Sequence, residues 1–252
     1  MTSTRPTPQQ LALGFSDEAD SVTAASELRQ EQSSSAAVEK SALDSVSIDL
    51  MEKIVDGGNM ERAWKKVKAN RGAPGPDGVT LDAFFETFRH QGPEVRRQLL
   101  EGTYQPGPAR RKSIPKPDGS MRDLGIPNVV DRVIQQAILI VLTPLFDPAF
   151  SESSYGFRPK RSASGAIKQI QTTIRQGYRH CVDMDLSKFF DRVQHDVLLS
   201  QVSCQVHDKR LLKLIGRYLR AGVMVDGLLQ PSAEGTMQGG PLTPQTILQK
   251  KG

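Results

Sequence analysis

The stretch CVDMDLSKFFDRV, residues 181–193, sets three aspartates, Asp183, Asp185 and Asp191, among apolar side chains. Its first half alternates, which predicts a strand over residues 179–186, followed by a turn into a helix. Acids in an apolar strand are costly to bury unless a cation meets them. Strand alternation directs Asp183 and Asp185 to one side, and carboxylate oxygens suit Mg²⁺. This pair is therefore a candidate cation site, although a lone acid here would more simply end a strand.

A second stretch, IPKPDGSMRDLGIP at residues 114–127, has a Pro-Asp-Gly turn between two extended basic flanks. This pattern predicts a hairpin. Lys116 and Arg122 flank the turn, where mobile cations can reach a triphosphate without a rigid pocket. The alternative interpretation is an ordinary solvated basic hairpin.

A third stretch, YGFRPKRS at residues 155–162, predicts an irregular basic loop. Arg158, Lys160 and Arg161 are candidates for contacts with a phosphate backbone, and Tyr155 or Phe157 for packing under a template base. The alternative is that Phe157 belongs to the core. Ser162 is a candidate N-cap for the helix that follows, whose apolar face is Ala163, Ala166, Ile167, Ile170 and Ile174.

Two further segments carry candidate binding residues. Met60, Ala63, Trp64 and Val67 follow helical spacing, and the outer face of that helix holds Lys65 and Lys66, with Arg71 just after it. These cations are candidates for RNA contacts, with a solvated helix face as the alternative. Near the end, the glycines of GTMQGGPLTP, residues 235–244, allow close approach of a nucleotide or template strand.

The rest of the sequence sets the domain organisation. Residues 1–45 are rich in Ser, Thr, Ala, Gln and Glu and predict a disordered acidic leader, whereas residues 46–252 form the folded domain. Residues 1–50 hold three basic and eight acidic side chains, a net charge of −5 within a total of +5. The folded part is thus strongly basic, and a polyanionic partner is expected. Residues 129–142 predict an apolar helix, and VMVDGLLQ, residues 223–230, a tight hairpin.

Several function classes are disfavoured. The two cysteines have no zinc-ligand spacing, which disfavours a zinc site and fits a reduced, cytoplasmic compartment, bacterial or organellar. The longest apolar run, AILIVL, is too short to span a bilayer, so no membrane partner is expected. The histidines show no Ser-His-Asp or Cys-His pattern. The oligomeric state is left open.

The order of these blocks resembles the fingers and palm of a reverse transcriptase of the group II intron maturase type, over about residues 50–244. The resemblance implies an α+β (mixed α/β) right-hand polymerase fold, rich in helices, with a small antiparallel palm sheet. It implies an RNA-directed DNA polymerase that adds dNTPs to a primer 3′-hydroxyl by two-metal catalysis with Mg²⁺. The implied partners are template or intron RNA, a DNA primer and a dNTP.

The resemblance also implies roles for individual residues. Asp185 is the catalytic metal-binding acid, the Leu186 carbonyl completes the contact, and Asp183 is a second candidate. Phe190, five positions after Asp185, matches the aromatic residue that packs against the nucleotide sugar, whereas Asp191 is assigned a local role. Four further residues match the nucleotide-contacting positions: Lys116, Arg122, Gln238 and Gly239. Met237 stands where the family usually has proline.

The family's site also needs an aromatic-x-Asp-Asp block after QGGPLTP, and QTILQKKG, residues 245–252, contains no acid. The sequence is therefore expected to be an N-terminal part of such an enzyme, inactive by itself. The alternative hypothesis is a non-catalytic remnant that binds intron RNA, and a third is an unrelated nucleic-acid-binding protein. An incomplete palm sheet also predicts exposed apolar surface and poor solubility.

Overall fold

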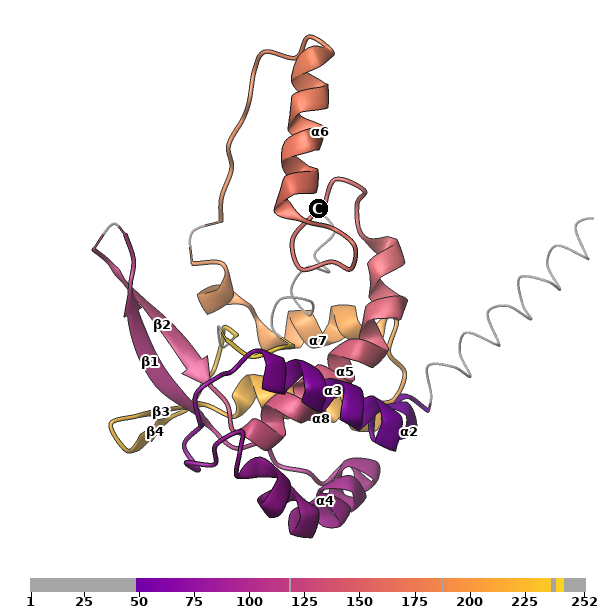
Figure 1. Cartoon of the computed structure of the whole chain (residues 1–252), viewed down its shortest axis with the longest axis vertical. Helices are drawn as coiled ribbons and strands as arrows, with labels where there is room; N and C mark the ends of the chain where they lie inside the picture. Colours follow the sequence, from indigo (N-terminus) through magenta and orange to yellow (C-terminus); the bar gives the residue numbers. More distant parts are fainter. Residues whose placement is uncertain (1–48, 118, 187, 237–238, 243–252) are drawn as a thin grey trace, which may run out of the picture. The chain divides into compact units, whose positions relative to one another are not determined.

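The computed structural model of the protein describes residues 49–117, 119–186, 188–236 and 239–242 (Figure 1). The predicted leader and Gln238 lie outside these residues. The helices are α2 (Leu50–Ile54), α3 (Gly57–Ala69), α4 (Phe84–Glu101), α5 (Val129–Phe146), α6 (Ala163–Arg175), α7 (His195–Ser203) and α8 (Lys209–Arg220), with short 3₁₀ turns η1 (Asp147–Ala149) and η2 (Phe190–Arg192). The strands are β1 (Ala109–Pro115), β2 (Met121–Ile126), β3 (Val223–Val225) and β4 (Leu228–Gln230).

Helix α5 is the centre of the core, and its burial explains its apolar sequence. Val133, Ile134, Ala137 and Ile138 are at most 2% exposed. The segment Val129–Ala149 is long and apolar enough to cross a membrane, but 61% of its most apolar window is buried inside the fold. Burial of this extent is the pattern of a core helix. The predicted apolar helix over residues 129–142 is thus confirmed.

Helix α3 is held on α5 by a buried amide as well as by apolar packing. The Asn59 side chain donates to the carbonyl oxygens of Ile54 and Ala137, at 3.0 and 3.2 Å. Asp56 caps α3 by accepting a hydrogen bond from the Asn59 backbone at 3.1 Å, as an N-terminal acid commonly does. The predicted burial of Ala63, Trp64 and Val67 on the inner face is confirmed.

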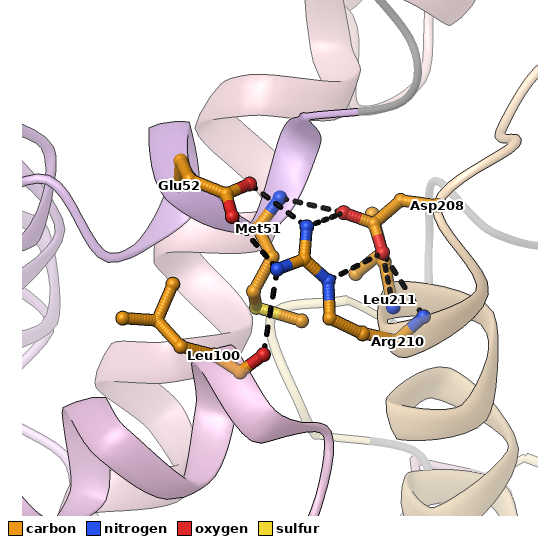
Figure 2. Close-up of polar contacts among 6 residues, drawn as sticks. All are labelled: Met51, Glu52, Leu100, Asp208, Arg210 and Leu211. Atoms are coloured by element: carbon orange, nitrogen blue, oxygen red, sulfur yellow. Dashed lines mark hydrogen bonds and ion pairs between the residues drawn. The ribbon is translucent and has the colours of Figure 1, made fainter.

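One guanidinium joins three helices that are far apart in the sequence (Figure 2). Arg210 of α8 donates to both Glu52 carboxylate oxygens of α2, at 2.7 and 2.8 Å, and to the Leu100 carbonyl oxygen of α4 at 3.4 Å. It also donates to Asp208, the N-cap of α8, which in turn accepts from the Met51 backbone at 3.0 Å. Since the Asp208 side chain is 2% exposed, this network is partly buried.

The sheet has the order β2-β1-β3-β4 and is mixed. Strand β1 pairs with β2 and β3 with β4 in antiparallel fashion, but β1 and β3 are parallel. The expectation of a purely antiparallel sheet is therefore corrected. A parallel pair needs a long crossover, and here α5 to α8 lie between β1 and β3 in the sequence.

Both predicted hairpins are present. In the β3–β4 hairpin, Asp226 and Gly227 have φ values of 49° and 81°. Positive φ at both central residues is the type I′ geometry that an Asp-Gly pair favours. In the β1–β2 hairpin, Ile114 pairs with Arg122 and Pro115 with Met121, so Lys116 directly follows the last pair.

The predicted strand over residues 179–186 is wrong. The chain between α6 and η2 forms no strand among its described residues (Figure 1), and Val182 and Met184 are 78% and 87% exposed. Alternating apolar and polar residues form a strand only where one face of the strand can be buried and a neighbouring strand can pair with it. No described strand lies alongside this segment.

Helix α6 forms where the sequence predicts it. The Ser162 side chain caps it by accepting a hydrogen bond from the Gly165 backbone at 3.2 Å. Its apolar face is exposed, however, because Ile167, Ile170 and Ile174 are each more than half accessible. Helix α6 has no buried residue. The helix and the segment after it therefore leave apolar surface without a partner among the described residues.

Candidate functional site

The tip of the β1–β2 hairpin holds the two cations predicted to reach phosphate groups. The Lys116 backbone donates to the Ser120 carbonyl oxygen at 2.7 Å, and the Gly119 backbone donates to that of Lys116 at 3.0 Å. This turn closes the hairpin and leaves Lys116 and Arg122 exposed on its two sides.

The turn that carries Phe190 is fastened to the loop that begins GTMQGG. The Thr236 backbone donates to the Phe190 carbonyl oxygen at 2.7 Å, and the Gly235 backbone donates to that of Val193 at 2.8 Å. The His195 ring nitrogen Nε2 lies 2.7 Å from the Gly235 carbonyl oxygen. Gly235 has a φ of 80°, and a Cβ atom there would lie 2.8 Å from the Asp191 carbonyl oxygen. A side chain at this position would therefore disturb the contact.

The same loop packs against the base of the hairpin. Gly239 has a φ of 119°, and a Cβ atom there would lie 2.6 Å from the Gly125 carbonyl oxygen. Only glycine fits this approach. The structure therefore brings the Phe190 turn, Gly239 and the base of the hairpin together from three separate parts of the sequence.

A cleft of about 260 Å³ lies between these elements, and we call it the hairpin cleft. Its charged lining comprises Arg111, Asp123, Asp191 and Glu234. Arg111 is ion-paired with Asp123, whose pKa is lowered by the hydrogen bond from Arg111. Acids therefore outnumber cations in this lining.

The predicted metal-binding residues do not line this cleft. Asp183 and Asp185 are exposed on the segment after α6, and the Asp185 carboxylate accepts a hydrogen bond from the Leu186 backbone at 2.9 Å. The Leu186 carbonyl oxygen accepts from the Phe189 backbone at 3.2 Å. Within the part of the chain that the structure describes, no group of three acidic, histidine or cysteine side chains is placed to hold a metal ion.

The basic loop before α6 is built around Arg158. Its guanidinium donates to the Asp147 carboxylate at 2.8 Å and to the carbonyl oxygens of Asp147, Ser151 and Ser154. It also lies 5.4 Å from the centre of the Phe150 ring. The Arg158 side chain is only 5% exposed, so it stabilises the loop from inside.

The other predicted RNA-contacting residues reach the surface in different ways. Lys160 is exposed with a φ of 59°. Arg161 is ion-paired with Glu152 and lies 5.4 Å from the centre of the Tyr155 ring. Lys65 is ion-paired with Glu61 at 2.7 Å, whereas Lys66 and Arg71 are exposed.

A comparison with protein families identifies the family of this chain. The model described as "Reverse transcriptase (RNA-dependent DNA polymerase)" matches residues 114–249, more than half of the chain. The chain belongs to the reverse transcriptase family. This match covers the tip and the second strand of the β1–β2 hairpin, the basic loop, the aspartates and the glycine-rich loop.

Individual relatives of this reverse transcriptase chain agree with the family match. Protein YkfC of Escherichia coli (strain K12) is 37% identical over 175 residues, covering 68% of this chain and 46% of the relative. The group II intron-encoded protein LtrA of Lactococcus lactis subsp. cremoris is 34% identical over 186 residues, covering 72% of this chain and 30% of the relative. The chain thus spans less than half of the length of either relative.

A solved structure supports the same fold. A chain of a partial Cas6-RT-Cas1–Cas2 complex superposes with a TM-score of 0.53 and 25% identity, covering 79% of this chain and 33% of that chain. The predicted group II intron resemblance and the mixed α/β polymerase fold are therefore confirmed.

Sequence reasoning missed two arginines that fasten the loop after α3. Arg132 and Arg110 donate to the carbonyl oxygens of Ala73 and Pro74, each at 2.8 Å, and so tie the loop after α3 to α5 and β1. The signal in the sequence is the RGAPGPDG turn, whose carbonyl groups need donors. Arginines scattered through other elements could not be matched to it without the fold.

A buried acid was missed as well. Asp131 of α5 accepts hydrogen bonds from the hydroxyls of Tyr104 and Tyr218, at 2.9 and 3.1 Å, and from the Gly107 backbone at 3.2 Å. Burial raises the pKa of Asp131 to about 6, although hydrogen bonds to the charged form oppose the shift. The cluster fixes the chain that leads into β1 against α5 and α8.

Proposed function

We propose that this chain is the RNA- and nucleotide-binding part of a reverse transcriptase of the group II intron type. The observation that carries the proposal is the meeting of the β1–β2 hairpin, the Phe190 turn and the Gly239 loop. All three blocks are the ones that the resemblance assigns to the incoming nucleotide. In this proposal Lys116 and Arg122 bind the β- and γ-phosphates, Phe190 contacts the sugar, and Gln238 and Gly239 border the nucleotide.

The RNA-binding surface is proposed to consist of surface cations on two elements. Lys65, Lys66 and Arg71 belong to α3 and its end, and Lys160 and Arg161 to the basic loop. Exposed cations suit contacts with a phosphate backbone. We reassign Arg158 to a positioning role, because its donors are occupied within the loop.

Members of the reverse transcriptase family catalyse DNA polymerisation, and this reaction implies Mg²⁺ as the metal ion. Asp183, Asp185 and the Leu186 carbonyl provide part of a donor set, but no third acid joins them among the described residues. This donor set does not fit two magnesium ions, so we derive no reaction step from it. We infer that the 252-residue polypeptide does not extend a primer by itself.

The second candidate function is binding of intron RNA without catalysis. The exposure of Asp183 and Asp185 on a segment without strand pairing favours it.

The exposed free cysteines Cys181 and Cys204 fit the proposed reducing, cytoplasmic compartment.

Binding of a structured intron RNA in a gel-shift salt series tests the proposal. We expect the affinity to fall steeply as salt rises, because phosphate contacts release counterions. Lys66→Ala with Lys160→Ala is expected to lower the salt slope by about 1 for each phosphate that is no longer neutralised. Absent binding, or binding that does not respond to salt, would overturn the proposal.

A further inference from the structure

The basic loop displays Phe157 in an unusual way. The residue is 75% exposed, and its φ of 54° lies in the left-handed region. This region is unfavourable for a bulky residue. The neighbouring Arg158 fixes the loop through its buried hydrogen bonds. Strained backbone conformations of this kind cluster at functional sites, so the exposed ring of Phe157 is a candidate binding group.

A second cleft lies beside this ring, and we call it the Phe157 cleft. It has a volume of about 440 Å³ and is lined by Lys66, Gln136, Ile140, Pro144, Phe157 and Pro159, among others. Among the described residues, it shares none of its lining with the hairpin cleft. A cleft with mostly apolar walls and a few polar groups fits a flat aromatic ligand.

Gln136 gives the cleft a polar group that can form hydrogen bonds with a ligand. Its side chain lines the cleft, the residue is 6% exposed, and the amide makes no hydrogen bond with any residue that the structure describes. The amide carries both donors and an acceptor at the wall of the cleft, so a ligand that accepts and donates hydrogen bonds can pair with it.

The charges around the cleft select an anionic ligand. Lys66 lines it and Lys160 follows Phe157 by three positions, and neither has an ion-pair partner among the described residues. An exposed aromatic ring, an amide and nearby cations are the groups that bind an unstacked base together with its phosphates.

We propose that the Phe157 cleft holds one base of single-stranded RNA, stacked on Phe157, with the Gln136 amide at its edge and Lys66 and Lys160 at the flanking phosphates. The inference rests on the proposed RNA-binding function and names a site for that RNA. A dNTP is not the proposed occupant, because the nucleotide-handling blocks meet at the hairpin cleft.

Fluorescence anisotropy with a short, unstructured, labelled single-stranded RNA tests the proposal in a salt series. Phe157→Ala is expected to raise the Kd about tenfold, the usual effect of losing one stacked base, and to leave the salt slope unchanged. Phe157→Trp should retain the wild-type Kd. Tyr178→Ala is the matched control, since Tyr178 is 66% exposed and lies outside the cleft lining, and its Kd should not change.

Thermal unfolding separates recognition from a structural role. Phe157→Asn suits left-handed backbone better than phenylalanine does, so its melting temperature should equal or exceed that of the wild type while its Kd rises. A lowered melting temperature, or an unchanged Kd in Phe157→Ala when the wild type binds RNA, would overturn the inference. Failure of the wild type to bind RNA would instead overturn the proposed function.

Discussion

Asp131 is a buried acid whose charge state affects the stability of the fold. Its carboxyl group is buried and accepts three hydrogen bonds, which tie the chain before β1 to α5 and α8. Burial still outweighs these bonds and raises its pKa to about 6 from 3.8. The folded protein therefore binds a proton more tightly at this site than the unfolded chain does.

This shift predicts a pH dependence of stability. Asp131 contributes stability that is complete below its unfolded pKa and is lost as the pH rises through its folded pKa of about 6. The loss is on the order of 3 kcal/mol. Urea unfolding of the wild type and Asp131→Asn across this range checks the prediction, because only the wild type carries this contribution. A difference between the two that does not change with pH would contradict it.

Gly239 carries a second prediction at the residue scale. Gly239→Ala should weaken nucleotide binding, because its Cβ would meet the Gly125 carbonyl oxygen and displace the loop. Gly227→Ala is the matched control, since Gly227 also has a positive φ but an added Cβ has nothing within 4 Å. Equal nucleotide affinities in the two variants, measured by titration with a fluorescent dNTP, would count against this packing.

At the scale of elements, Arg210 joins α2, α4 and α8. Arg210→Ala should lower the free energy of unfolding by about 2 kcal/mol, because Asp208 would remain buried with fewer partners. Arg97→Ala is the control, since its ion pairs with Glu94 and Glu101 are exposed. Exposed pairs of this kind contribute little to stability because water and salt screen them. Equal losses in chemical denaturation would contradict the role of the partly buried network.

The elements also indicate how far sequence reasoning reaches. The Asp226-Gly227 turn fixes the β3–β4 hairpin locally, and Ser162 caps α6 as its sequence predicts. The pairing of β1 with β3 and the failure of residues 179–186 to form a strand depend on distant partners. Local patterns do not contain that information. Similarly, the ring of Phe157 could be assigned to core or surface only once the loop was placed.

At the scale of the whole molecule, α6 leaves an apolar face exposed. Replacing Ile167, Ile170 and Ile174 together with glutamine should reduce self-association, because these exposed side chains form one apolar stripe. Val197→Gln is the control, as Val197 is 56% exposed on α7. Light scattering after size-exclusion chromatography measures the effect. A wild type that stays monomeric at high concentration would contradict the prediction.

The central claim is that this reverse transcriptase chain binds RNA but does not polymerise by itself. The most direct measurement is primer extension on a primed RNA template with Mg²⁺ and dNTPs, run beside a gel shift of the same complex. We predict a salt-sensitive shifted complex with no extended primer. Processive extension of the primer by the purified 252-residue polypeptide would contradict the claim.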